Sequence, residues 1–201
     1  MSFIDQAAKA QVALSQNYLK EGTYWAVIEA GKEGRAQFKG FDFVAYDLTT
    51  IRCVKPASDG NSTKELEAVN ILFVAGQKGS DTRLKQFALI GMGFDYEQAK
   101  KIPDDKARDM MSATVNPVHQ EMKNVIVEIE AKTKNTQSGK EIVATDVRRR
   151  VWPSEVQAPD NWKKLPLDVQ QYLTQGGRLQ TMLAKEAQDR PAFAAYAAGL
   201  K

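Results

Sequence analysis

The sequence is poor in the residues that build disulfides, metal centres and membrane spans. Its 201 residues include one cysteine, Cys53, and one histidine, His119. A single cysteine excludes an intramolecular disulfide, and no Cys/His cluster is present that could hold a structural zinc. No apolar run approaches the length of a membrane span, and the first residues lack the basic start and apolar run of a signal peptide. We therefore expect a cytoplasmic protein with no membrane partner and no cofactor.

Motifs of enzyme active sites are also missing. No serine or cysteine lies in a nucleophile motif that would make His119 part of a catalytic triad. Asp104, Asp105 and Asp109 could bind a metal, but the basic residues around them favour a solvated helix surface. Residues 76–80 contain glycine, lysine and serine without the spacing of a phosphate-binding loop. The sequence therefore predicts a protein that is not an enzyme.

The composition that remains is ordinary for a globular protein. Hydrophobic residues make up 43% of the chain and charged residues 26%. The net charge of +3 and the sequence pI near 8.8 are only mildly basic. This balance permits binding to nucleic acid without requiring it.

Alternation with a period of two predicts strands, most clearly in residues 124–132. Val125, Val127, Ile129 and Ala131 occupy one face there, which is the pattern of a half-buried strand. A polar, glycine-containing loop follows, and residues 141–152 alternate again, so the two segments are expected to form a hairpin. In the second segment we expect Val143, Thr145, Val147, Arg149 and Val151 to share a face. Strand composition also occurs in residues 23–30, 38–54 and 68–75.

Helical patterns occur between these strands and after them. Residues 81–91 have an apolar helical face and end at Gly91. Residues 95–115 are helical in composition, with an interruption at Pro103, and the tail after Trp152 contains three short helical segments. We expect an N-terminal helical arm (1–22), a β domain (23–152) and a helical tail (153–201). The tail could pack on the domain or on another protein.

These elements predict a mainly β protein of the α+β class. Gly40, inside an aromatic strand, suggests a bend of the kind that curls a sheet into a barrel. The expected architecture is a small five-stranded barrel with a mid-domain helix, a helical insertion and C-terminal helices. The competing architecture is an open sheet with helices on one face, and the pattern does not separate the two.

The closing hairpin carries an excess of basic residues. From Lys132 to Trp152 there are six lysines and arginines and two acidic residues. A cationic hairpin that ends in a tryptophan could follow a phosphate backbone and stack a base. Alternatively, the charges belong to a solvated strand edge and deter aggregation.

Three short motifs occur in one order along the chain. They are EGTY at residues 21–24, RLKQFALIG at 83–91, and the hairpin that begins with KNVIVE at 123–128 and continues through Gly139-Lys140. In this combination the sequence resembles the phage-encoded single-stranded DNA-binding proteins with an oligonucleotide/oligosaccharide-binding (OB) fold, over roughly residues 21–152. The resemblance implies an OB-like barrel that binds single-stranded DNA without reading its sequence.

Such a surface needs a positive groove and aromatic platforms. The candidates for base stacking are Trp25, Phe41, Phe43, Tyr46 and Trp152. The candidates for phosphate contacts are Arg35, Lys39, Lys132, Lys134, Lys140, Arg148, Arg149 and Arg150. Trp152 is the best single stacking candidate, because it shares a face with Arg148 and Arg150. Aromatic residues at alternating strand positions are most often core, so we expect at least half of the five to be buried. Three adjacent arginines point to both faces of a strand, so we expect at least one to pair with an acidic residue.

The resemblance implies protection of single-stranded DNA during phage replication or recombination, in the host cytoplasm. Replication or recombination proteins would then be further partners, and a homo-oligomer is compatible with this role. The alternative is a non-enzymatic phage or mobile-element protein that docks an assembly or interaction partner through its helical tail. A nuclease with scattered carboxylates is a third, weaker interpretation.

Overall fold

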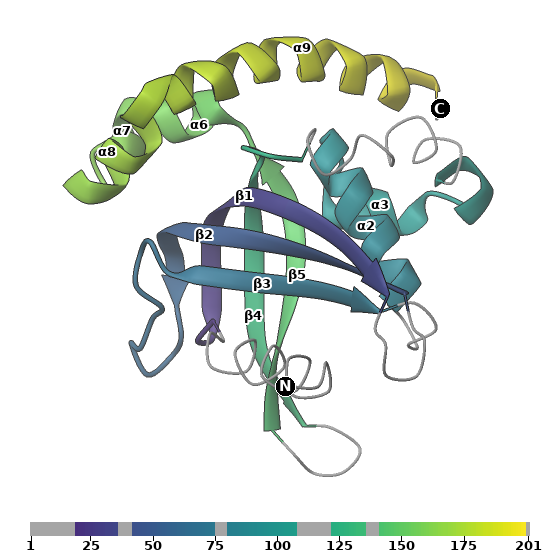
Figure 1. The fold of residues 1–201 in the computed structure, drawn as a ribbon, viewed down its shortest axis with the longest axis horizontal. Coiled ribbons are helices and arrows are strands. Elements are labelled where there is room, and N and C mark those ends of the chain that lie inside the picture. The colour runs from purple at the N-terminus through teal and green to yellow at the C-terminus, as the bar shows by residue number, and fades with distance from the viewer. Residues whose placement is uncertain (1–18, 36–41, 75–79, 108–121, 136–140, 200–201) are drawn as a thin grey trace.

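The computed structural model describes residues 19–35, 42–74, 80–107, 122–135 and 141–199. Within these residues five strands form one antiparallel sheet in the order β3-β2-β1-β4-β5 (Figure 1). The strands are β1 (Gly22–Arg35), β2 (Asp42–Pro56), β3 (Ala68–Val74), β4 (Ile126–Asn135) and β5 (Glu141–Val151). The predicted strands and the mixed α+β class are confirmed. The two edge strands β3 and β5 are not paired with each other in the described residues, so the sheet is open and the predicted barrel is not confirmed.

Helices follow the third and the fifth strand. Between β3 and β4 lie α2 (Ser80–Met92) and α3 (Tyr96–Lys101), where the mid-domain helix and the start of the helical insertion were expected. The rest of that insertion, from residue 108, lies outside the described residues. The tail forms α6 (Pro153–Gln157), α7 (Pro159–Trp162), α8 (Leu167–Thr174), the 3-10 turn η1 (Gln175–Gly177) and α9 (Arg178–Gly199). Figure 1 shows that α9 crosses one end of the sheet and that α2 and α3 lie beside the sheet.

The strand β1 is buried on both faces, and its side chains alternate between two cores. Tyr24, Ala26 and Ile28 enter a first core, which also contains residues of α2 such as Phe87. Trp25 and Val27 point to the other side and enter a second core. Gly22 starts this strand with a φ of 145°, and a Cβ there would lie 2.6 Å from the Lys55 carbonyl oxygen. The glycine of the EGTY motif is therefore required by the close approach of β2.

The second core joins the tail to the sheet. From the sheet it takes Trp25, Val27, Ile51, Ile126 and Val151, and from the tail Val156, Leu165, Val169, Leu173 and Met182. These side chains are buried, so most of the apolar surface of the short tail helices is used within the chain. Of the two alternatives for the tail, packing on the β domain is the one observed. The helical arm expected at residues 1–22 lies mostly outside the described residues, and Gly22 already belongs to β1.

The carboxylate of Glu29, a partly buried residue of β1, binds side chains from two tail helices. The Tyr172 hydroxyl of α8 donates a hydrogen bond to it, and the Arg178 guanidinium of α9 pairs with it. Arg178 also donates to the Asn124 side chain over 3.0 Å. Burial opposes the ionisation of Glu29, but the hydrogen bonds from Arg178 and Tyr172 outweigh it and hold the pKa of Glu29 below its usual value.

Because the pKa of Glu29 is lowered in the folded protein, we expect the fold to lose stability in acid and the Glu29→Gln variant to lose less. A carboxyl group with a lowered folded-state pKa stabilises the fold above its unfolded pKa of about 4.3, and the contribution disappears as the pH falls through the folded value. We expect Glu29→Gln to have a lower Tm at pH 7 and to lose less Tm than the unaltered protein between pH 5 and pH 3. Thermal melts followed by circular dichroism measure both. The control is Glu97→Gln on the exposed surface of α3, which should behave like the unaltered protein. Equal acid sensitivity of the Glu29 variant and the unaltered protein would contradict the assignment.

Candidate nucleic-acid interface

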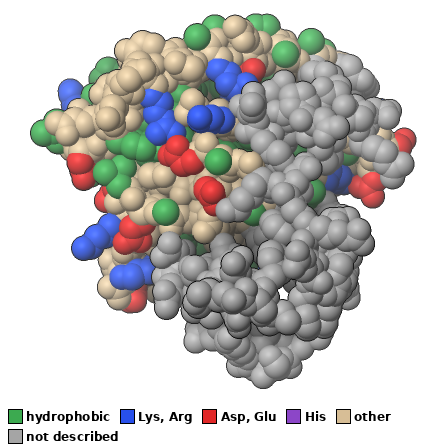
Figure 2. Space-filling model, in the orientation of Figure 1, with side chains coloured by type: hydrophobic (Ala, Val, Ile, Leu, Met, Phe, Trp, Pro, Cys, Tyr) green, Lys and Arg blue, Asp and Glu red, His purple; other side chains and the backbone are tan. Residues whose placement is uncertain are grey.

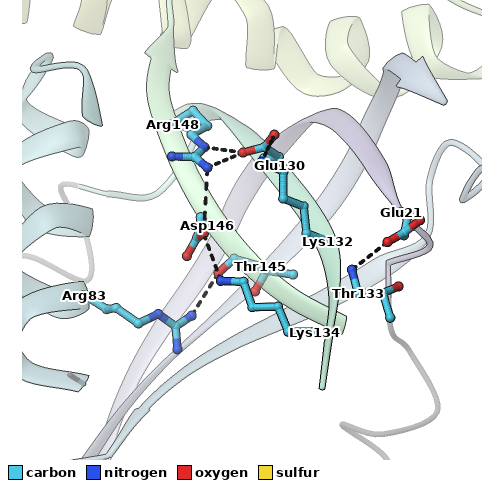
Figure 3. Close-up of polar contacts among 9 residues, drawn as sticks. All are labelled: Glu21, Arg83, Glu130, Lys132, Thr133, Lys134, Thr145, Asp146 and Arg148. Carbon is cyan, nitrogen blue, oxygen red and sulfur yellow. Dashed lines mark hydrogen bonds and ion pairs between the residues drawn. The ribbon is translucent and has the colours of Figure 1, made fainter. Parts of the chain in front are cut away.

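The β4–β5 hairpin brings two carboxylates directly opposite each other. In the strand register Glu130 of β4 pairs with Asp146 of β5. Like charges in this position destabilise a sheet unless cations lie between them. Lys132 Nζ lies 2.8 Å from Glu130, Lys134 Nζ lies 3.7 Å from Asp146, and Arg148 bonds to Glu130 and approaches Asp146 to 3.9 Å (Figure 3). The result is a network of three cations and two carboxylates on one surface, which we call the hairpin network.

The two lysines of this network remain accessible. Their side chains are 56% exposed in Lys132 and 52% exposed in Lys134, whereas Arg148 is mostly covered. The hydrogen bond from Lys132 lowers the pKa of Glu130, and Arg148 lowers it further. Burial acts in the opposite direction, but the pKa stays below its usual value. Because a lysine ammonium has three donors, each lysine can bind an additional anion while its carboxylate contact persists.

Helices α2 and α3 extend this surface beside β5. The Arg83 guanidinium of α2 donates a hydrogen bond to the Thr145 carbonyl over 2.9 Å and lies over the Phe73 ring of β3. Tyr96 of α3 lies beneath the guanidinium of Arg148, at 4.4 Å from the guanidinium carbon to the ring centre. The Asp95 and Gln98 side chains form a capping box that starts α3 and fixes the position of Tyr96.

A small hollow, with a volume of about 20 Å³, lies between the two open edges of the sheet. It is lined by Ile71, Phe73, Arg83, Gln86, Phe87, Tyr96, Thr145, Asp146 and Val147, which come from β3, α2, α3 and β5. Helix α2 therefore bridges the gap between the edge strands, and the hairpin network forms part of the rim. The hollow is smaller than a typical ligand pocket, so any large ligand would lie across it rather than inside it.

Arg149 follows an irregularity in the strand pairing and lies on the side of the hairpin that carries Glu128, where it is paired with acidic residues. Its guanidinium donates two hydrogen bonds to the Glu155 carboxylate, over 2.9 and 2.7 Å, and approaches Glu128 to 3.2 Å. The hydrogen bond to Glu155 raises the pKa of Arg149. Burial acts in the opposite direction, and the charge of Glu128 adds to the increase. Arg148, Arg149 and Arg150 each pair with an acidic residue, which confirms the prediction that at least one of them does.

Arg150 occupies an interior position rather than the surface position expected from the sequence. It is 5% exposed, and its guanidinium donates to the Gly91 carbonyl over 2.8 Å and to Asp189 of α9 over 2.5 Å. Its guanidinium carbon also lies 4.2 Å from the ring centre of Trp152, and that of Arg190 lies at 4.9 Å. Trp152 is thus half-buried and already has cation–π partners, so the leading stacking candidate is a structural contact in this conformation.

Two other aromatic candidates lie in the cores. Tyr46 is 1% exposed and packs against Phe73 and Phe87. Trp25 is 4% exposed and donates through Nε1 to Glu128 over 3.1 Å. Both follow the expectation that aromatics at alternating strand positions are core, and this corrects their selection as surface stacking candidates.

The remaining candidates are Arg35, Lys39, Phe41, Phe43 and Lys140. The backbone of Arg35 pairs with Asp42, and that of Phe43 pairs with Gly34 and Val74, but the structure does not describe the side chains of Arg35 and Phe43. Lys39, Phe41 and Lys140 lie outside the described residues.

Four members of the surface were not marked as site residues from the sequence: Arg83, Tyr96, Glu130 and Asp146. The capping box around Tyr96 is readable in the sequence, but nothing in the sequence places that helix beside β5. In the carboxylate cluster considered from the sequence, Asp104 pairs with Lys85 at 2.6 Å. Among the described residues, no group of three or more histidines, cysteines and carboxylates is arranged to hold a metal ion.

Comparison with known proteins does not assign the chain to a family. Neither the protein-family models nor the curated proteins include a match to this sequence. Function is therefore inferred from the residues of this chain. In the part of the chain that the structure describes, no helix has the length and apolar character needed to cross a membrane.

Proposed function

We propose that this protein binds single-stranded DNA without sequence preference, using the β4–β5 hairpin of an OB-like fold. The observation that carries the proposal is the strand order β3-β2-β1-β4-β5 with α2 inserted between β3 and β4. If this sheet curls until β3 approaches β5, it becomes a five-stranded Greek-key barrel, and the OB fold is a partly open barrel of that kind. The hollow lined by both edge strands and bridged by α2 supports this interpretation.

The charges of the hairpin network support a polyanionic ligand. Three cations contact the carboxylates of Glu130 and Asp146, and Arg83 lies nearby at the Thr145 carbonyl. With the Glu21 carboxylate, which accepts from the Thr133 amide, Figure 3 shows four cations and three carboxylates. The surface therefore keeps a positive balance, and its lysines are accessible to phosphates. Figure 2 shows basic and acidic side chains next to one another on the described part of the face it displays. The hairpin network itself mixes cations and carboxylates, and such a mixture favours moderate, salt-sensitive binding over tight binding to any polyanion.

In this role the protein acts stoichiometrically, without catalysis. It coats and protects single strands during replication or recombination, and the order of motifs along the chain makes a phage origin our working hypothesis. The alternative, docking of a partner through the helical tail, is less favoured because the tail helices bury their apolar residues against the sheet.

Fluorescence anisotropy with a labelled oligo-dT of about 30 nucleotides, long enough for several OB-fold sites, tests the proposal. Protein is titrated at two salt concentrations, with duplex DNA as the competitor. We expect binding that weakens as salt is raised, with a log–log slope of about −0.7 per phosphate contact, and that duplex DNA displaces poorly. No binding at low salt, or equal displacement by duplex DNA, would refute single-stranded DNA binding.

A further inference from the structure

The cations proposed to contact phosphates are already engaged by carboxylates of the same hairpin. Glu130 accepts from Lys132 and Arg148, and Asp146 lies close to Lys134 and Arg148. The two acidic side chains are more buried than the two lysines they contact. Both carboxylates point toward the cations of the hairpin network, as the close-up in Figure 3 shows.

A carboxylate and a phosphate use the same kind of contact, because both offer anionic oxygens to N–H donors. A glutamate is ionised at neutral pH, and the hydrogen bond from Lys132 lowers the pKa of Glu130 further. An arriving phosphate must either replace a carboxylate at a cation or share the cation with it. In both cases the fixed negative charges of Glu130 and Asp146 repel the phosphate at short range.

We propose that Glu130 and Asp146 set the affinity of the hairpin for single-stranded DNA by competing with its phosphates for Lys132, Lys134 and Arg148. This inference rests on the proposed DNA binding and adds the residues that limit it. DNA binding is therefore weaker than it would be if the cations had no carboxylate partners. At each cation, a phosphate of the DNA takes the place of a carboxylate of the hairpin. Such an exchange suits a protein that must leave single-stranded DNA when another protein needs the strand.

The substitutions Glu130→Gln and Asp146→Asn test the inference, since each removes a charge and keeps the shape and an oxygen acceptor. Oligo-dT of about 30 nucleotides is the probe, measured by anisotropy over a range of salt concentrations. Each variant should bind about fivefold more tightly than the unaltered protein, from the loss of one nearby like charge. The slope of log affinity against log salt should also steepen by up to about 0.7, because one more cation is free to neutralise a phosphate.

The matched control is Asp160→Asn in α7, an exposed position of the tail that makes the same change in net charge. Variants that bind no more tightly than this control, while the unaltered protein binds, would overturn the inference and leave the proposed function standing. Absence of binding by the unaltered protein would overturn both. If Glu130→Gln loses its fold in a thermal melt, Asp146→Asn decides the question alone, because its ion pairs of 3.7 and 3.9 Å are the longer ones.

Discussion

Replacing Asp189 by alanine is expected to lower the free energy of unfolding by about 3 kcal/mol, because it leaves the buried Arg150 without its counter-charge. The Arg150 side chain is 4% exposed, and Asp189 supplies its ion pair across the contact between β5 and α9. Burial lowers the pKa of Arg150, and Asp189 acts in the opposite direction. The Asp189 side chain is partly exposed, so water can reach the site after the substitution. We therefore expect a loss at the lower end of the range for removing one partner of a buried ion pair.

Urea denaturation measures this loss, with Lys185→Ala as the control. Lys185 approaches the same Asp189 carboxylate to 3.4 Å, one helical turn earlier on the surface of α9. Loss of that partly exposed pair should change stability by less than about 1 kcal/mol. Similar losses in the two variants would show that Arg150 does not depend on Asp189. Arg150 is also unsuitable for testing DNA contacts, because its replacement would disturb the fold.

Replacing Leu173 by alanine is expected to destabilise the protein by about 3 kcal/mol, as is typical of a large-to-small change in a core. Leu173 of α8 is fully buried in the second core, where the tail covers Trp25, Ile51 and Ile126 of the sheet. The substitution removes apolar contacts and leaves a cavity under the tail. The second core does not include the hairpin network, so the folded fraction of the variant should bind DNA as the unaltered protein does.

The control for this prediction is Leu167→Ala, at the start of the same helix. Leu167 is 69% exposed, and its truncation should change stability by less than about 0.5 kcal/mol. Chemical denaturation of both variants gives the comparison. Equal effects would mean that the tail is not packed on the sheet as described, and docking of a partner through the tail would become the better hypothesis.

The strands could be predicted from the sequence because their alternation follows burial closely. Val127, Ile129 and Ala131 of β4, with Val125 just before it, all enter the first core, as predicted. This strand is polar on much of its other face, so a period of two is easy to recognise. The five strands and the helix before the final pair were also predicted from the sequence, whereas the predicted closure of the sheet into a barrel is not confirmed.

The prediction for β5 was wrong where the strand is irregular. Val147 and Val151 were expected to share a face, but Val147 enters the first core and Val151 the second. The register shifts between Glu128 and Ile129, whose partners are Arg149 and Val147, so Arg148 is an extra residue. Such a bulge reverses the alternation beyond it, and no glycine or proline marks it in the sequence.

The partners of the arginines could not be predicted for a different reason. Arg150 pairs with a residue 39 positions later, in a helix whose docking depends on the whole second core. The sequence predicted an acidic partner for at least one of the three arginines, and in the structure each described cation of the hairpin has an acidic neighbour. A count of residues along one segment cannot reveal counter-charges that arrive from β4, α6 and α9.

The salt dependence of DNA binding by Lys132→Ala/Lys134→Ala tests the central claim most directly. The two lysines are the most exposed cations of the hairpin network, so their loss should weaken binding to oligo-dT and reduce the slope of log affinity against log salt by about 1.4. Lys163→Ala/Lys164→Ala, at exposed positions of the tail after α7, removes the same charge and should leave the slope unchanged. Equal slopes for the two double variants would contradict binding through the β4–β5 hairpin.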